Sequence, residues 1–415
     1  MNKVVGEFWL GIGVLLISIA SCKESNKTIS NLSSDVPIDT IHVLKKDEFD
    51  YLKSSKFVNS FRFLTLKTEG DFLGRFDKIR LYNGVLFILD RTRNMVVAFD
   101  HKTGEELFRI AEEGEGPGQY GSADDFSINR FNKTLEILYR RGQMTLAYDL
   151  ESGQFIREIP YSFYSYFFNS FSSGDKLFFN GVLPNSLDPK DSINAQMFNA
   201  DSENNLVSIA YPMTWEAGKM GHSTRRNLTS YGTTDKVNFV PYYSSKVYKI
   251  GSDGFLSGYH LSFDGRPTSD EALVLFTGES RDWARFLYNR TQPYINNITD
   301  FFENDFCLSF MYADGPGRYF FFYDKSSKKG VSLKHLKDDL GVLAVFPIGI
   351  TDTELIASVA YEEIDGRIEL LEMMVEDKEE LKERSDYQQL VSIRNASKSP
   401  NPILVFYDLK IDEGL

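Results

Sequence analysis

Cysteine is scarce in this 415-residue chain. Cys22 and Cys307 are its two cysteines, so the sequence excludes a disulfide framework and a cysteine-rich zinc site. Cys307 lies in the alternating stretch 306–310, which predicts a buried thiol within a strand. The five histidines are scattered, and no two have the spacing of metal ligands on one element. The sequence therefore predicts neither a metal site nor a cofactor.

Positive charge is also in short supply. Asp and Glu outnumber Lys and Arg by 59 to 46, and the formal net charge is -13. Nucleic-acid binding needs a basic face that neutralises phosphates, so nucleic acid is excluded as a partner. The sequence also lacks a nucleophile elbow, an HExxH motif, a P-loop and an EF-hand. The common signatures of hydrolases, ATPases and calcium-binding proteins are therefore missing.

The N-terminal apolar run is too short to span a membrane. Residues 8–20 comprise 13 positions, whereas a transmembrane helix needs about 20. With Lys3 before it, the run is typical of a secretory signal peptide. It ends in Ile19-Ala20-Ser21-Cys22, which resembles the lipobox of bacterial lipoproteins. We therefore predict a lipoprotein signal peptide over residues 1–22.

The lipoprotein resemblance implies a membrane anchor. It implies a diacylglyceryl thioether on Cys22 and a further acyl chain, such as palmitate, on its amino group, and several acyl chains make anchoring effectively permanent. In that family an Asp after the cysteine retains the protein in the inner membrane. Lys23 stands there instead, which implies the outer membrane of a Gram-negative bacterium, with the periplasmic and surface-facing sides both left open. Residues 23–36 are polar and rich in Ser and Asn, which predicts a flexible tether before one domain at residues 37–415.

Four segments of the chain end in the same way. Each is a short apolar or aromatic run closed by an acidic residue, at Asp100, Asp149, Asp324 and Asp408. Asp100 and Asp149 are 49 positions apart, close to the roughly 40–50 residues of one four-stranded propeller blade. A strand and turn that recur at this period predict a repeat fold.

The clearest repeat predicts one four-stranded antiparallel sheet. Asn83-Gly84 within it is the strongest two-residue hairpin signal. Its expected strands are residues 78–82, 85–89, 95–99 and 106–110. Three further units begin near Phe126, Phe167 and Asn297, and another ends at residues 255–261.

The sixth unit has three expected strands, at residues 342–347, 354–360 and 403–409. Residues 61–66, near the N-terminus, supply the fourth and thereby remove two exposed sheet edges. We therefore predict an all-β, six-bladed β-propeller of four-stranded antiparallel blades, closed into a ring by an N-terminal strand.

Two insertions interrupt the repeats. Residues 262–296 contain a helical stretch at 279–288, and residues 366–394 form a charged helix inside the last blade. Leu370, Leu371 and Leu381 recur on that helix at helical spacing. Their apolar face either docks a partner protein or packs on its own domain, and the sequence leaves both interpretations open.

The blade motifs carry a resemblance. Residues 95–120 resemble an NHL-type propeller repeat, in which a glycine-rich connector follows the fourth strand. Residues 37–412 resemble the six-bladed β-propeller lipoproteins of Gram-negative bacteria, which share the lipobox and three further motifs. These motifs are the connector 114–118 before Asp125-Phe126, the block 247–254 and the terminal strand 401–405. The resemblance implies a propeller fold anchored to the cell envelope.

One face of the predicted ring collects arginines and aspartates. Connectors between blades and the turns between second and third strands lie on the same face of a propeller. These positions hold Arg75, Asp77, Arg91, Arg93, Asp124, Asp125, Arg140 and Arg141. The guanidinium forks either bind carboxylates or sulfates of a ligand, or form ion pairs between blades with Asp90, Asp124 and Asp125.

The sequence favours a binding or interaction scaffold that uses this axial face. Its expected ligand is a glycan, a peptide or a partner protein, and its other contact is the membrane through the lipid anchor. The alternative is a propeller enzyme, a lyase or hydrolase with a site in the channel. Such a site needs three or more inward His, Asp or Glu side chains from different blades. The sequence offers Asp77 and Asp125 but no histidine at equivalent positions, so we predict no catalytic residues.

Overall fold

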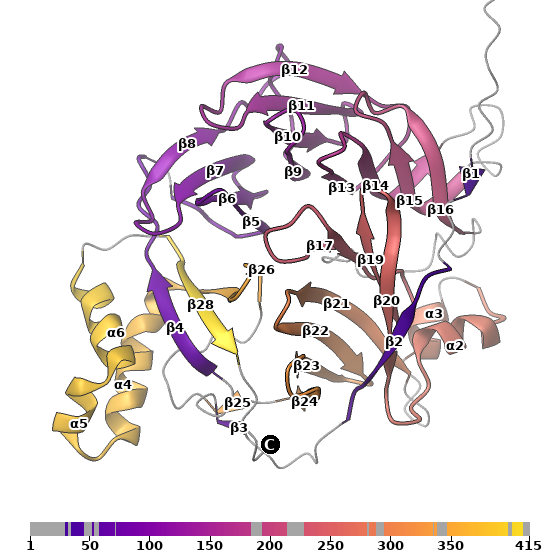
Figure 1. Cartoon of the computed structure of the whole chain (residues 1–415). Coiled ribbons are helices and arrows are strands. Elements are labelled where there is room, and N and C mark those ends of the chain that lie inside the picture. The colour runs from indigo at the N-terminus through magenta and orange to yellow at the C-terminus, as the bar shows by residue number, and fades with distance from the viewer. Residues whose placement is uncertain are drawn as a thin grey trace, which may run out of the picture.

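Six antiparallel sheets surround a central axis in the computed structural model (Figure 1). The predicted six-bladed β-propeller is confirmed. The structure describes residues 30–31, 35–44, 52–53, 58–70, 72–183, 193–213, 228–279, 282–287, 294–334, 336–337, 347–396 and 401–409.

Blades one to three follow the predicted strands closely. Asn83 (φ 47°) and Gly84 (φ 79°) both have the left-handed conformation that a tight hairpin between right-twisted strands requires. Blade one consists of β5 (Lys78–Tyr82), β6 (Val85–Asp90), β7 (Met95–Asp100) and β8 (Glu106–Ile110). Blade two consists of β9 (Asp125–Asn129), β10 (Thr134–Tyr139), β11 (Met144–Asp149) and β12 (Phe155–Pro160). Blade three consists of β13 (Phe167–Ser170), β14 (Lys176–Leu183), β15 (Ile193–Ala200) and β16 (Leu206–Met213).

Blades four to six depart more from the prediction. The first two strands of blade four, β17 (Leu228–Ser230) and β18 (Val237–Phe239), were not predicted, whereas β19 (Lys246–Gly251) and β20 (Gly254–Ser262) were. Blade five consists of β21 (Ile295–Glu303), β22 (Cys307–Asp314), β23 (Gly317–Asp324) and β24 (Lys329–Leu333). Blade six consists of β26 (Gly349–Ile350), β27 (Leu355–Val359), β28 (Ile403–Leu409) and β4 (Val58–Leu64). Among the described residues its first strand is β26; the strand predicted at 342–347 lies outside them except for Pro347.

The ring is closed by β4, which confirms the predicted closure. Phe63 pairs with Val405 in the antiparallel ladder between β4 and β28. Asn59 Nδ2 also donates a 2.7 Å hydrogen bond to Asp408 Oδ2. The closing strand runs from Val58 to Leu64, slightly before the predicted residues 61–66.

The residues before β4 form an N-terminal arm of three short strands. β1 (Ser30–Asn31) pairs in parallel with β16, and β2 (Ile38–His42) pairs in parallel with β20. β3 (Leu52–Lys53) pairs with β25 (Leu336–Lys337), which follows blade five in the chain. The arm thus covers the outer edges of blades three and four, where unpaired backbone groups would otherwise be exposed. Ser30 and Asn31 belong to the stretch predicted as a tether, so part of that stretch lies against blade three.

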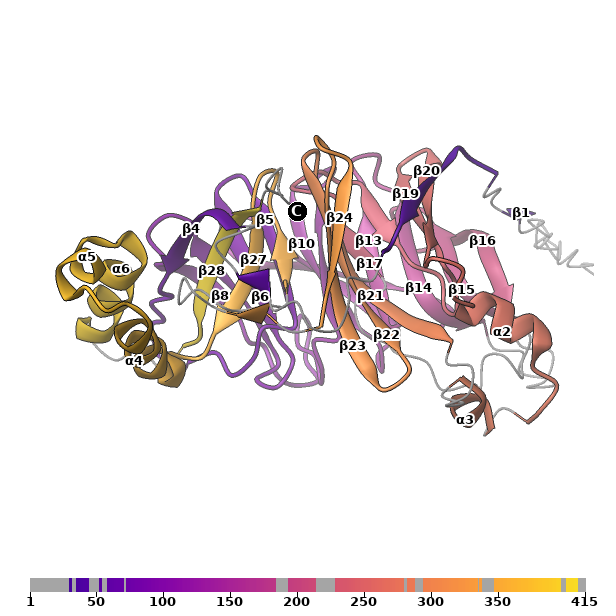
Figure 2. The ribbon, with the colours of Figure 1, turned by 90° about the horizontal axis from the view of Figure 1, so that it is seen from below.

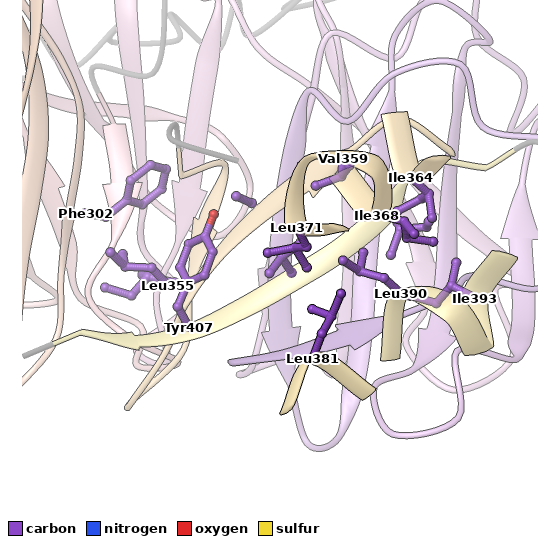
Figure 3. Packing of buried hydrophobic residues seen from close by; sticks show 14 residues of the cluster. Phe302, Leu355, Val359, Ile364, Ile368, Leu371, Leu381, Leu390, Ile393 and Tyr407 are labelled. Carbon is purple, nitrogen blue, oxygen red and sulfur yellow. The ribbon is translucent and has the colours of Figure 1, made fainter. Parts of the chain in front are cut away.

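The insertion in blade six is three helices rather than one. α4 (Ile364–Met374), α5 (Lys378–Glu383) and α6 (Ser385–Asn395) follow a short 3-10 helix, η4 (Tyr361–Glu363). The break before α5 arises because Val375 is extended and the Asp377 side chain accepts from the Glu379 and Glu380 amides as an N-cap. Leu371, Leu381 and Leu390 share one cluster with Leu355 and Tyr407 of blade six (Figure 3). The apolar face of these helices therefore packs on its own domain.

Buried charged groups connect neighbouring blades. Glu136 of blade two and Lys176 of blade three are both fully buried, and their charged groups are 3.2 Å apart. Glu303 of blade five accepts hydrogen bonds from Lys249 Nζ (3.2 Å) and the Tyr259 hydroxyl (2.6 Å) of blade four. Cys307 is a buried free thiol in β22, as predicted.

Candidate functional site

The six innermost strands meet at a narrow channel on the ring axis. On the connector face, the mouth of this channel is a cavity of about 40 Å³. Residues from all six blades line it: Asp77, Lys78, Ile79, Arg80, Leu89, Arg91, Asp125, Phe167, Leu228, Thr229, Phe302 and Ile348. A cavity of this size has room for a few water-sized groups and not for a sugar or a peptide side chain.

Three of the predicted site residues come together at this mouth. Asp77, Arg91 and Asp125 line it, and the Asp77 carboxylate accepts the Arg91 amide at 3.0 Å. The exposed Arg75 guanidinium pairs with Asp77 at 3.1 Å. Asp125 is buried and accepts from Lys78 Nζ at 2.8 Å, so its cation is the lysine of blade one rather than an arginine.

The other predicted arginines lie on neighbouring turns, mostly against aromatic rings. Arg93 stacks over Phe72 at 4.0 Å and Arg140 over Tyr166 at 4.4 Å. Arg140 also pairs with Asp124 at 3.8 Å, within one blade rather than between two. Arg141 is exposed.

Asp90 binds backbone amides, whereas the sequence suggested that it could form ion pairs with arginine side chains. Its carboxylate accepts four backbone amides, those of Gly74, Arg75, Thr92 and Arg93, at 2.6–3.1 Å. Asp90 therefore shapes the connector and the turn that present these arginines.

The opposite end of the channel is closed by the turn between β17 and β18, residues 231–235, which we call the channel plug. Thr233 accepts from the Arg130 guanidinium of blade two and donates to Asp352 of blade six (2.8 and 2.6 Å). The Gly232 amide donates to the Glu303 carbonyl of blade five at 2.8 Å. Figure 1 shows this turn near the centre of the ring. The channel is therefore not a through-pore.

A much larger cleft of about 590 Å³ lies beside blade five on the connector face. We call it the blade-five cleft. Its walls are the β18–β19 loop, the start of β21, the β22–β23 turn and α3 (Trp283–Leu287), which follows α2 (Ser269–Leu275). Figure 2 shows α2 and α3 on the same side of the ring as the β22–β23 turn. The lining includes Tyr242, Tyr243, Ser244, Ala284, Asn296, Asn297, Thr299, Asp300, Tyr312 and Arg318.

Three residues of the cleft have left-handed backbones although none is glycine. Their φ angles are 56° at Tyr243, 52° at Asn297 and 53° at Asp300. Asn and Asp tolerate this conformation, whereas a bulky tyrosine rarely adopts it. The register of β21 against β22 shifts twice, between Asn296 and Thr299 and between Thr299 and Phe302. Bulges of this kind often re-aim side chains beside binding sites.

A small aromatic core supports the cleft wall. Trp283 of α3 is fully buried and contacts Tyr243 edge-on at 5.0 Å and Phe276 at 5.1 Å. Burial raises the pKa of Tyr243, so this phenol stays neutral. The Asn296 amide donates to the Tyr294 carbonyl at 2.9 Å. Its Oδ1 is buried and has no hydrogen-bond partner among the described residues.

The chemistry of the cleft suits binding more than hydrolysis. Tyrosines offer apolar faces with polar tips, and asparagine, serine and threonine offer neutral donors and acceptors. Among the described residues that line the cleft, Asp300 is the one carboxylate and Arg318 the one cation. Glycoside hydrolysis commonly needs a pair of carboxylates, which this lining does not provide.

Sequence reasoning missed this cleft. The available signal was the insertion at residues 262–296, which interrupts the blade repeat and carries α2 and α3. The predicted helical stretch at 279–288 corresponds to α3, while α2 lies before it. The left-handed backbone at Tyr243 has no sequence signal, because a bulky tyrosine rarely adopts this conformation.

Comparison with known proteins identifies the family. Residues 30–358 match DUF5128, described as a 6-bladed beta-propeller. The chain belongs to this family. The matched segment begins at Ser30, the first residue of β1, so the N-terminal arm lies within it.

A solved structure shows the same fold. A Bacteroides fragilis protein whose name describes it as exported is similar, with 19% sequence identity and a TM-score of 0.69 over 89% of this chain and 99% of that one. A member of the DUF4221 family from Bacteroides vulgatus has 11% identity and a TM-score of 0.47 over 86% and 97%. No curated protein matches the chain.

Two findings concern metals and membranes. In the part of this family member that the structure describes, no group of three His, Cys, Asp or Glu side chains is placed to hold a metal ion. Nor does any helix in those ranges have the length and apolar content needed to cross a membrane.

Proposed function

We propose that this propeller is an exported, lipid-anchored protein of the cell envelope that binds a neutral, hydroxyl-rich ligand, such as an oligosaccharide, in the blade-five cleft. The three left-handed residues around one cleft carry this proposal. Strained backbones persist where the surrounding structure fixes them, and they concentrate at binding and catalytic sites. The cleft volume of about 590 Å³ lies within the roughly 300–1,000 Å³ of small-molecule sites.

The arrangement of the lining favours a glycan over a charged ligand or a peptide. Tyrosine faces and neutral amides match the apolar faces and hydroxyl groups of a sugar ring. A peptide that adds to a sheet needs an exposed strand edge, whereas β21 and β22, which line the cleft, are paired with each other. The cavity at the axial mouth, which three of the eight predicted site residues line, holds about 40 Å³ and cannot enclose either ligand.

The anchoring part of the proposal rests on residues 1–22, which lie outside the described residues. The apolar run, the lipobox that ends at Cys22 and the Lys23 that follows it support export and attachment to the outer membrane. The name of the Bacteroides fragilis relative agrees with export. We expect Cys22→Ala to move the protein from the membrane fraction to the soluble fraction with unchanged thermal unfolding. A variant that still sediments with membranes and incorporates labelled palmitate contradicts lipidation at Cys22.

The ligand part is tested with a glycan array, followed by calorimetry on the glycans that bind. Ala284 is exposed on α3 and lines the cleft, whereas its neighbour Arg285 is exposed and does not appear in the lining. Ala284→Trp fills the cleft and is expected to weaken binding at least tenfold, while Arg285→Trp is the matched control and retains it. If Ala284→Trp binds the glycan with wild-type affinity, the ligand binds outside the blade-five cleft. An array without glycan binding, together with binding of peptides, contradicts the ligand class.

A further inference from the structure

Three cationic side chains converge inside the channel, between the connector-face mouth and the channel plug. Lys78 and Arg80 are two positions apart on β5, so strand alternation directs both toward blade two. Arg80 lines both the 40 Å³ mouth and a second cavity of about 20 Å³ beside the plug, which places it midway along the channel. Arg130, which follows β9, also lines the second cavity.

The anionic groups nearby are already engaged. Asp125 binds Lys78 Nζ and accepts the Phe168 amide at 2.9 Å. Asp235 accepts the amide and hydroxyl of Ser172. At the mouth, the Asp77 carboxylate accepts the Arg91 backbone amide and pairs with the exposed Arg75 guanidinium.

Lys78 is paired with a carboxylate, whereas Arg130 and Arg80 form no hydrogen bond to one among the described residues. Arg130 donates to the Thr233 carbonyl and lies 4.9 Å over the Tyr82 ring. Arg80 Nη2 is shielded from solvent and has no hydrogen-bond partner among the described residues. Burial lowers the pKa of Arg80 to about 10, with Asp125 opposing the shift and Arg130 adding to it. A buried charged donor without an acceptor is costly, and an anion at this point supplies one.

We propose that the channel contains a binding site for a small monovalent anion of chloride size, held by Arg80 with Arg130 and Lys78 around it. The two cavities of about 40 and 20 Å³ exceed the ~10–15 Å³ that one water-sized group needs, so each has room for an ion of chloride size. The anion supplies the acceptor that Arg80 Nη2 lacks between blade one, blade two and the channel plug. It therefore acts as an inorganic link at the centre of the ring, separate from the blade-five cleft.

Bromide, which replaces chloride and scatters anomalously, tests the site directly. Crystals grown in sodium bromide are expected to give an anomalous peak within hydrogen-bonding distance of Arg80 Nη2. A water at that position, with no anomalous signal, overturns the proposal. This measurement uses the wild-type protein, so it decides the question even where substitutions at Arg80 prevent folding.

Thermal unfolding provides the second test. The melting temperature of the wild-type protein is expected to rise with chloride concentration when sodium gluconate keeps the ionic strength constant, because an anion that binds only the folded state stabilises it. Arg80→Met is expected to lose this chloride dependence. Arg141→Met, at an exposed arginine, is the control and retains it. Equal melting temperatures in chloride and gluconate, or the same chloride dependence in Arg80→Met, contradict the proposal.

Discussion

Glu136 and Lys176 lie fully buried between blades two and three, with their charged groups 3.2 Å apart. Glu136 also accepts from Asn129 Nδ2 (2.9 Å) and Ser170 Oγ (2.7 Å). Burial lowers the pKa of Lys176, and the neighbouring carboxylate opposes that shift. Removing one member of such a pair leaves a buried charge without compensation, which typically costs about 3–5 kcal/mol.

We therefore expect Lys176→Met to lower the free energy of unfolding by about 3–5 kcal/mol in urea titrations. The control is Arg157→Met, which breaks the exposed Arg157–Glu203 pair (2.9 Å), where the expected loss is about 0–1 kcal/mol. Adding Glu136→Gln to Lys176→Met is expected to restore part of the loss. Equal losses in Lys176→Met and Arg157→Met contradict this account.

Lys78 gives the channel a pH response. Burial lowers its pKa from 10.5 to about 8, with Asp125 opposing the shift and Arg80 and Arg91 adding to it. Between about pH 8 and 10.5 the unfolded chain therefore binds more protons at this position than the folded one, so the contribution of Lys78 to stability rises with pH in that window. The difference in unfolding free energy between wild type and Lys78→Met is expected to shift in favour of wild type between pH 7.5 and 10. Parallel pH profiles of the two proteins contradict the lowered pKa. Comparing the two cancels the titration of buried tyrosines, which both proteins share.

At the scale of elements, α4, α5 and α6 belong to the core of blade six. Leu371 of α4 is fully buried, whereas Met373, two positions later, is 76% exposed. We expect Leu371→Ala to cost about 2–5 kcal/mol of unfolding free energy and Met373→Ala less than about 0.5 kcal/mol. Similar small effects from both substitutions indicate that the helices are not packed on the blade in solution.

The elements also show what the sequence could predict. Strands of five or more residues beside clear turns, such as β5 and β6 around Asn83-Gly84, were predicted correctly because alternation and hairpin chemistry are local. β17, β18 and β26 have two or three residues each, too few to show alternation. The single helix predicted at 366–394 is divided by the cap at Asp377, whose role depends on an extended Val375.

The candidate site was harder to predict than the fold. The turns that carry Arg91 and Arg140 were assigned to one face from topology alone, and Asp77, Arg91 and Asp125 do line the channel mouth. Arg80 was read as one polar residue of an alternating strand. The shielding of its Nη2 atom depends on blade two and the channel plug, which are distant from Arg80 in the sequence. The blade-five cleft likewise depends on contacts between α3, β21 and two turns that are far apart in sequence.

For the whole molecule, β28 is the strand on which ring closure depends. It lies between β27 and β4, so its loss exposes an unpaired edge on each side. Deleting residues 401–415 is therefore expected to cause aggregation, or a large fall in melting temperature, in size-exclusion chromatography and thermal unfolding. A truncated protein that stays monomeric and melts like the full-length chain contradicts the role of β28 in closure.

The pairing of β4 with β28 also determines how late in synthesis the ring can close. Asn59 and Asp408, which bond across this pair, are 349 positions apart in the chain. At about 5–20 residues per second of synthesis, β4 emerges roughly 20–70 s before its partner strand exists. Hairpins within each blade form from neighbouring residues, but the contacts of highest sequence separation form last, because their loop-closure entropy must be met first. During that interval the ring gives the apolar residues of β4 no protection, and the export proposed above would require the chain in this unclosed form.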